Sequence, residues 1–540
     1  MAVKMPLSYF GVLLFMSYIP VIDLFAGPGG LGEGFCSFST KRGARPFRIG
    51  LSVEKDATAH RTLELRSFFR QFPPRKAPDA YYQYLRREIT REELFDQHPK
   101  EAMRARREAM HRELGKDNVE IDARILEVIP KKGQGPWVLI GGPPCQAYSQ
   151  VGRSRMSKMR KEDLANYEKD KRHYLYQQYL RILAKFQPDV FVMENVTGML
   201  SHKVKGESIM DRILTDLQDP SQWAVDNGEQ QSDILGYRVF SLVVEKKSGE
   251  ELSPSDFVIN FEDYGIPQCR HRVIILGVRR GLVAKPSILT PHEGVIPLEH
   301  VIADLPPLRS GLSKEHDSES EWRKAVKSAG RQLWMRDVDP LLRKVIKAAA
   351  RRVVRGLDTG SECTDSECRP RYRSDWYLDE RLQAVCNHTS RHHIRQDLHR
   401  YLFVACYARL KKWSPRMRDF PKGLWPEHKN VKEAAAGKMF PDRFRVQFAG
   451  NPATTITSHI SKDGHYYIHY DPCQCRSLTV REAARIQTFP DNYLFEGGRT
   501  PQYKQVGNAV PPLLARQIAD IVYDVLKTCE VEPIVDGHFE

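Results

Sequence analysis

Short apolar runs of strand length recur through the first 280 residues of the chain, and each is ended by glycine, proline or a charged residue. The runs are Tyr18–Phe25, Ile49–Val53, Trp137–Ile140, Val190–Met193 and Val273–Val278. Unbroken apolar character over four to eight residues is typical of buried parallel strands. A stretch with helical spacing, Tyr174–Phe186, lies between two of them. This alternation of apolar strands with a helical stretch predicts an α/β domain with a doubly wound sheet.

The first run leads into a glycine-rich turn. Gly27, Gly29 and Gly32 fit the spacing G-x-G-x-x-G, in which glycine lets the backbone approach a ligand and lets the following helix pack closely. The second run ends at Glu54, whose carboxylate can accept hydrogen bonds from a ribose diol. Dinucleotide-binding and adenosyl-binding proteins share this pair of features, and a tight structural turn has the same spacing. The pattern alone therefore leaves the ligand open.

A thiol follows the third run. Gly141-Gly142-Pro143-Pro144-Cys145-Gln146 begins where the strand ends. Consecutive prolines hold the backbone extended and exclude helix up to Cys145. Most single cysteines are simply buried apolar residues, but this one is flanked by a stiff loop and a polar tail that reaches Arg153. Because open α/β sheets bind ligands at the carboxyl ends of their strands, Cys145 is a candidate nucleophile.

Charged side chains stand at two further strand ends. Glu194 directly follows Val190–Met193, so we expect it at the same sheet edge as Cys145. Gln268, Arg270 and Arg272 alternate with Cys269 and His271 and should share one face. Two guanidinium groups and an amide in a row suit the binding of a carboxylate, a phosphate or a base edge.

Two segments break the α/β rhythm. Residues 57–133 are charged and helical in character, and we interpret them as a solvated helical insertion without chemistry. From about residue 280 to 474, basic clusters alternate with aromatic residues, at 341–355, 391–400 and 409–413, as in a phosphate-contacting surface. Regular structure returns with a helix over 478–487, where Thr479 and Glu482 form a capping box. The stretch 505–512 then opens a final helix to about Leu526.

The composition of the chain indicates its kind of partner and its cellular location. The 540 residues contain 83 Lys and Arg against 68 Asp and Glu, a net charge of +15, which favours a polyanionic partner. Ten irregularly spaced cysteines indicate a reducing, cytoplasmic location rather than a disulfide framework. Cys363, Cys368, Cys473 and Cys475 have poor spacing for zinc, so no metal is expected. The apolar stretch Pro6–Leu24 resembles a signal peptide, but cleavage there would damage the first strand, and no other stretch could span a membrane.

Taken together, these motifs resemble the C5-cytosine-specific DNA methyltransferase family of bacterial restriction-modification systems. The resemblance rests on DLFAGPGGLGEGF, VEKD, GGPPCQAYSQVGR, MENV, QCRHRVIILG, LTVREAARIQTFPD and QVGNAVPP, in that order. It implies a Rossmann-like catalytic domain over residues 1–280 that resumes at 476–540. Residues 281–475 would form an irregular target-recognition domain.

The resemblance also implies catalytic roles. Cys145 would attack C6 of cytosine, which makes C5 nucleophilic. Glu194 would assist at N3, Arg272 would hold O2, and Arg270 would steady Glu194 and the sugar-phosphate. The Pro144 carbonyl would accept a hydrogen bond from the exocyclic amine, and Gln268 completes the row. The base must leave the duplex for this chemistry.

S-adenosylmethionine is the cofactor that the resemblance implies. The residues expected to bind it are Asp23, Phe25, Ala26, Gly27, Gly29, Gly30, Glu54, Asn508, Ala509 and Val510, with Asp122 as the acid between the second strand and the Cys145 loop.

The expected partner is double-stranded DNA, bound by a monomer, and a restriction endonuclease could act separately on the same sequence. Three alternatives remain at this point: a tRNA cytosine methyltransferase with similar motifs, a catalytically silent DNA-binding module, and an NAD-dependent oxidoreductase. The long basic middle region favours duplex DNA over tRNA. A silent module would be expected to lack Cys145 or Glu194, and an oxidoreductase does not account for the motifs together.

Overall fold

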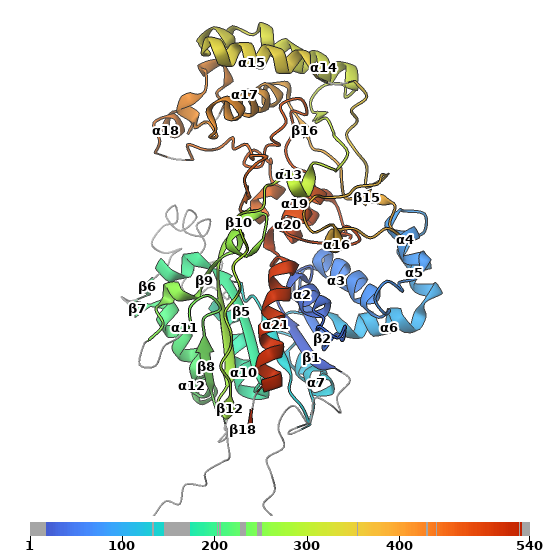
Figure 1. Ribbon diagram of the computed structural model, residues 1–540, viewed down its shortest axis with the longest axis vertical. Helices are drawn as coiled ribbons and strands as arrows, with labels where there is room; N and C mark the ends of the chain where they lie inside the picture. The colour runs from blue at the N-terminus through green and yellow to red at the C-terminus, as the bar shows by residue number, and fades with distance from the viewer. Residues whose placement is uncertain are drawn as a thin grey trace, which may run out of the picture.

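The computed structural model of the protein describes residues 18–131, 134–144, 173–201, 203–204, 207–226, 234–245, 251–353, 355–427, 430–438, 440–528 and 530–531. Its lower lobe contains the sheet and its upper lobe is mainly helical, and the chain returns to the lower lobe at its end (Figure 1). None of the helices formed by the described residues has the length and apolar character needed to cross a lipid bilayer.

The sheet has eight strands in the order β3-β2-β1-β4-β5-β11-β8, with β9 also paired to β11. Strands β3, β2, β1, β4 and β5 are parallel, and β11 is antiparallel to β5, β8 and β9. The strands are β1 (Ile19–Leu24), β2 (Phe47–Glu54), β3 (Ala109–His111), β4 (Val138–Gly141), β5 (Val190–Val196), β8 (Tyr237–Phe240), β9 (Val258–Asn260) and β11 (His271–Arg279).

Helices cover both faces of the sheet, because the strand residues are apolar on both sides. Helices α2 (Gly30–Ser37) and α21 (Pro512–Thr528) pack on one face, around Val21, Ile140 and Val192. Helices α7 (Asn118–Val128), α10 (His173–Phe186) and α11 (Ile209–Gln218) pack on the other. The doubly wound α/β fold expected from the apolar runs is confirmed.

The expected insertion is not a solvated element. It contains α3 (Ala57–Arg70), α4 (Asp79–Leu85), α5 (Arg91–Gln97), α6 (Pro99–Glu108), edge strand β3 and α7. Helices α3 to α6 bury an apolar cluster together with Leu382, Ala384 and Leu494 from distant parts of the chain. The hydroxyl of Tyr82 donates to Asp379 at 2.8 Å. The insertion therefore supports a hairpin of strands β14 (Cys363–Asp365) and β15 (Ala384–Cys386).

The upper lobe has its own apolar core, formed largely by α14 (Glu319–Ser328), α15 (Pro340–Arg351) and α17 (Arg395–Lys411). This region was expected to be irregular, yet its centre is a regular packing of helices. Between the lobes, α13 (Glu299–Ile302), α19 (Val480–Ile486) and α20 (Arg499–Asn508) share a further apolar cluster (Figure 1).

The C-terminal segment connects this junction to the sheet, because α19 and α20 lie in the junction and α21 packs on the sheet. The capping box of Thr479 and Glu482 is present at the start of α19, as the sequence predicts. The stretch 505–508 does not open the final helix, because it forms the end of α20, and the final helix α21 starts at Pro512.

Candidate active site at the carboxyl edge of the sheet

Glu194 and Arg272 form an ion pair where β5 and β11 lie side by side. In the antiparallel register Ile274 faces Glu194 and Val196 faces Arg272, so the two charged residues are diagonal neighbours on one face. Arg272 Nε lies 3.0 Å from Glu194 Oε1, and the two side chains are 14% and 13% exposed. The pair is thus shielded from bulk water but still reachable, as a group that acts on a bound molecule must be.

The loop that leads to Cys145 passes directly beside this pair. Strand β4 pairs with β5 so that Gly141 faces Met193, which places Gly142 next to Glu194. A Cβ atom on Gly142 would lie 3.0 Å from Glu194 Oε2, so a side chain there would press on the carboxylate. Asn195 Nδ2 donates to the carbonyl oxygen of Pro143 at 3.2 Å.

Pro144 is the last described residue of this loop, and Cys145 lies outside the described residues. Asn195 also lies at this site, although the sequence motif that contains it predicted a role only for Glu194. Its position directly after a strand-end carboxylate was the available signal, because a side chain there can reach the neighbouring strand's loop.

The glycine turn after β1 lies at the same edge, two strands from β5 in the sheet order. Phe25 and Gly27 have φ angles of 56° and 57°, which bend the chain sharply after the strand. Nothing lies within 4 Å of the place where a Gly27 side chain would begin, so open space adjoins the turn. The neighbouring Ala26 N–H donates to the carbonyl of Val53 in β2 at 3.1 Å.

Glu54 closes the turn from the end of β2. Its Oε2 accepts from the Gly27 N–H at 2.8 Å and its Oε1 accepts from the Asp56 N–H at 2.7 Å. Burial raises the pKa of this carboxyl group, against the opposing effect of those two backbone donors. A partly desolvated acceptor beside open space is suited to binding the hydroxyl groups of a ligand.

The returning C-terminal segment covers the start of α2. A Cβ atom on Gly30 would lie 2.2 Å from the carbonyl oxygen of Val510, so only glycine permits this contact. Gly29 precedes it as the left-handed N-cap of α2. Asn508 is exposed at the end of α20, whereas the Ala509 carbonyl accepts from Arg270 at 3.1 Å.

Asp23 lies beneath the turn rather than facing open space. Its side chain is 1% exposed, and a Cβ atom on Gly32 of helix α2 would lie 3.0 Å from its Oδ2. Burial raises the pKa of Asp23 to about 7. Asp23 therefore packs against helix α2.

Asp122 does not lie where the sequence analysis expected an adenosine-binding acid. It is part of α7, where both carboxylate oxygens accept from Arg181 of α10 at 2.7 and 2.8 Å, and Lys185 donates at 2.9 Å. The segment beside Glu54 instead follows β3, because His111 pairs with Glu54 in the sheet register. A three-residue edge strand, Ala-Met-His, has no recognisable strand pattern, so this segment was missed.

Gln268 and Arg270 both bind groups at the junction between the lobes. Arg270 is 1% exposed, and its guanidinium donates to the carbonyl oxygens of Ile456 at 2.7 Å and Ala509 at 3.1 Å. Gln268 donates to the side chain of Gln487 at 2.5 Å and accepts from the Ile456 N–H at 3.1 Å. Both residues join the sheet to the junction between the lobes. Glu194 is close enough to oppose the lowering of the Arg270 pKa, and the expectation that Arg270 steadies Glu194 stays a prediction.

Part of the expected basic surface is also internal. Arg391 and Arg400 are buried, and they donate to main-chain carbonyl groups, including those of Lys462 and Leu424. Cys363 faces Cys386 across the hairpin at 3.7 Å between sulfur atoms, rather than Cys368. The described residues contain no group of three or more His, Cys, Asp or Glu side chains that could hold a metal ion.

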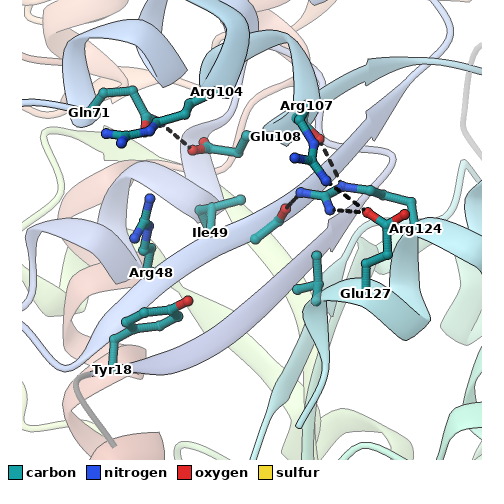
Figure 2. Close-up of a pocket in the computed structure, with 11 residues that line it drawn as sticks. Tyr18, Arg48, Ile49, Gln71, Arg104, Arg107, Glu108, Arg124 and Glu127 are labelled. Carbon is teal, nitrogen blue, oxygen red and sulfur yellow. Dashed lines mark hydrogen bonds and ion pairs between the residues drawn. The ribbon is translucent and has the colours of Figure 1, made fainter. Parts of the chain in front are cut away.

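A hollow of about 270 Å³ opens at the opposite edge of the sheet (Figure 2). Tyr18 and Arg48 line it from the amino ends of β1 and β2, and Arg107 and Arg124 both contact Glu127 on its other side. Because the candidate site lies at the carboxyl ends of the same strands, this hollow is separate from it.

Comparison with known proteins identifies the family. The chain matches the family described as "C-5 cytosine-specific DNA methylase" over residues 109–221 and 239–523. It is 33% identical to the type II methyltransferase M.Bpa9945I of Bacillus paralicheniformis, over 94% of this chain and 99% of that protein.

Two further relatives are more distant. The type II methyltransferase M.DdeI of Desulfomicrobium norvegicum is 27% identical, over 71% of each chain. The DNA (cytosine-5-)-methyltransferase M.ApeKI of Aeropyrum pernix is 26% identical, over 75% of this chain and 85% of that protein. The chain therefore belongs to the C5-cytosine-specific DNA methylase family and is a DNA (cytosine-5-)-methyltransferase.

Proposed function

We propose that this protein transfers a methyl group from S-adenosylmethionine to C5 of a cytosine flipped out of a specific duplex DNA sequence, as the modification enzyme of a type II restriction-modification system. One observation carries the proposal: the Glu194–Arg272 pair lies beside Gly142 and Pro143, in the loop that continues to Cys145. A carboxylate, a guanidinium and the loop that leads to a thiol thus lie together at one edge of the sheet.

Each group has a task in this chemistry. The Cys145 thiolate adds to C6, and the electron pair of the C5–C6 bond moves to C5, which becomes the nucleophile. Glu194 donates a proton or hydrogen bond to N3 and so neutralises the negative charge that the addition delocalises from C5 to N3. Loss of the C5 proton after methylation expels the Cys145 sulfur and restores the aromatic base.

The neighbouring groups fix the base. Arg272, already held by Glu194, donates to O2. The carbonyl of Pro144 accepts from the exocyclic amine, which cytosine has and thymine lacks. Flipping the base costs about a few kcal/mol, and these contacts offset it.

The glycine turn fits the proposed cofactor, because open space adjoins Gly27 and the Glu54 carboxylate stands beside it. Glu54 would accept from the ribose hydroxyls, while Phe25, Gly27 and Gly29 would line the adenosine and methionine parts. Val510 would hold the turn in place from the returning segment, through its contact with Gly30. S-adenosylmethionine supplies the electrophilic methyl group.

A methyl-transfer assay tests the proposal. Purified protein and labelled S-adenosylmethionine should label duplex DNA, and bisulfite mapping should show 5-methylcytosine within one short sequence. The Cys145→Ser variant should lose labelling but still bind DNA, because it keeps the charges that contact DNA. Labelling of tRNA in preference to DNA, or full activity of the Ser variant, would contradict the proposal.

We further propose that residues 281–475 select the sequence. They form most of the upper lobe, which has its own core and is joined to the sheet through the junction. Exchanging this segment for that of a relative with another specificity should move the methylated site while cofactor binding persists. Methylation at the original site after the exchange would show that sequence choice lies elsewhere.

A further inference from the structure

Exposed cations gather on the outer side of the upper lobe. Helix α15 buries Leu342, Ile346, Ala349 and Ala350 against the lobe's core. Its exposed side carries Lys344, Lys347 and Arg351 at helical spacing, and no acidic residue occurs from Pro340 to Arg351. We call these three residues the α15 basic face.

A second segment extends this surface. A Cβ atom on Gly330 would lie 3.7 Å from Lys347 Cγ, so the turn after α14 lies against the α15 basic face. Lys327 and Arg331 are exposed on that turn and on the end of α14. The basic surface therefore spans two elements, and it is not a single solvated stripe.

The cations of the α15 basic face have no acidic partner among the described residues. In the described part of the chain, the ion pairs of α14 join Arg323 to Glu319 and Lys324 to Glu321, and none includes the α15 basic face. Like charges three and four residues apart destabilise a helix, and an anionic ligand would offset this repulsion.

The position of the surface indicates which anion. Helices α14 and α15 lie at the end of the molecule away from the sheet (Figure 1), whereas Glu194 and Arg272 lie at the sheet edge. Phosphates next to a cytosine bound at that edge would not reach α15. Phosphates farther along a duplex, or on a second duplex, could do so.

We propose that the α15 basic face, with Lys327 and Arg331, binds the phosphate backbone of duplex DNA outside the segment that holds the target cytosine. The inference rests on the proposed function, since that function supplies the DNA. The binding is independent of sequence, because lysine and arginine contacts to phosphates carry no base information. It would increase affinity for long DNA and leave the choice of cytosine unchanged.

The test compares two triple variants of the full chain. One is Lys344→Gln, Lys347→Gln and Arg351→Gln, in which glutamine preserves helix propensity. The matched control is Lys41→Gln, Arg42→Gln and Arg45→Gln, which removes the same charge from an exposed lower-lobe loop. Equal melting temperatures would verify that both variants fold.

Binding is measured by fluorescence anisotropy at several salt concentrations, on a short duplex that just spans the mapped methylation site and on a long duplex containing it. For the α15 variant on the long duplex, the slope of log affinity against log salt should fall by about 3, or about 1 per lost phosphate contact. The short duplex and the control variant should show the wild-type slope. Methylation at saturating DNA should be unchanged.

A second arm identifies the source of the phosphates. If the wild type binds an added unrelated duplex while the short duplex is bound, and the α15 variant does not, a second DNA molecule is the ligand. Wild-type slopes for the α15 variant in both arms, or equal losses in the control, would overturn the inference. A wild-type protein that fails to methylate DNA would instead overturn the proposed function.

Discussion

Arg272 at the carboxyl edge of the sheet and Arg270 at the junction between the lobes are two residues apart in the chain, yet their surroundings differ. At the edge, Arg272 meets the carboxylate of Glu194 and both remain partly exposed. At the junction, Arg270 is buried against main-chain carbonyl groups, and Arg476 binds Glu482 through two contacts of 2.7 Å with both side chains 1% exposed. The first pair can still act on a bound molecule, whereas the side chains at the junction are buried and bind groups of the protein itself.

The electrostatics follow the same division. Burial and the neighbouring Arg272 lower the pKa of Arg270 to about 9, against the opposing effect of the Glu194 carboxylate. The carbonyl groups around Arg270 accept its hydrogen bonds. Burial alone would raise the pKa of Glu482, but Arg476 holds it well below its ordinary value. Junction residues should therefore govern stability, and edge residues should govern rate.

The largest expected effect concerns Glu194. A glutamine there keeps a hydrogen-bonding side chain for Arg272 but cannot deliver a proton to N3. The Glu194→Gln variant should lose about 10²- to 10⁴-fold in single-turnover rate, with cofactor affinity, DNA affinity and melting temperature near those of the wild type. A lowered melting temperature with an unchanged rate would place Glu194 in the scaffold.

Arg270→Met should show the opposite behaviour. The change removes the Arg270 donor from the buried carbonyl groups of Ile456 and Gly507, and such losses cost about 1–3 kcal/mol each. The Ala509 carbonyl keeps a donor, because Gln487 Nε2 also binds it at 3.2 Å. Urea unfolding should show a loss of about 3 kcal/mol in the free energy of unfolding, and Arg272→Met, as the matched control, should lose less than about 1 kcal/mol. Equal losses in the two variants would remove the distinction between edge and junction.

A further effect is a pH dependence of stability at Asp23. Its pKa is raised to about 7 by burial, so between about pH 4 and 7 the folded protein keeps a proton that the unfolded chain has released. Its stabilising contribution is complete below about pH 4 and is lost as the pH rises to about 7, by up to about 1.4 kcal/mol per pH unit.

Asp23→Asn lacks this titration. Relative to the wild type, its melting temperature without cofactor should therefore rise between pH 4 and 7 and then level off. A constant difference across this range would show that Asp23 is ionised in the folded protein.

The sequence predicted the edge better than the junction. Apolar runs located β1, β2, β4, β5 and β11, and strand-end residues placed Glu194 and the Gly142 loop together, because parallel strands end at one edge. The alternation of residues 268 to 272 also predicted correctly that Gln268 and Arg270 lie on one face of the chain. It could not reveal that carbonyl groups nearly two hundred residues away, such as that of Ile456, are the partners of Arg270.

Other misses have the same cause. Asp122 resembles a ligand-binding acid in sequence, and its partners on α10 become neighbours only once the sheet has folded. Strand β3 forms only because β2 offers it an edge. Local pattern identifies elements, whereas tertiary contacts decide which charged residues are left free for chemistry.

Covalent trapping tests the central claim most directly, because it reports the one bond that the proposed chemistry must form. DNA with 5-fluorocytosine at the mapped site, incubated with protein and S-adenosylmethionine, should give a stable protein–DNA adduct, since fluorine cannot leave C5 as a proton does. Peptide mass spectrometry should locate the adduct at Cys145, Glu194→Gln should form it more slowly, and Cys145→Ser should not form it. An adduct at another residue, or none with protein that methylates ordinary DNA, would contradict the account.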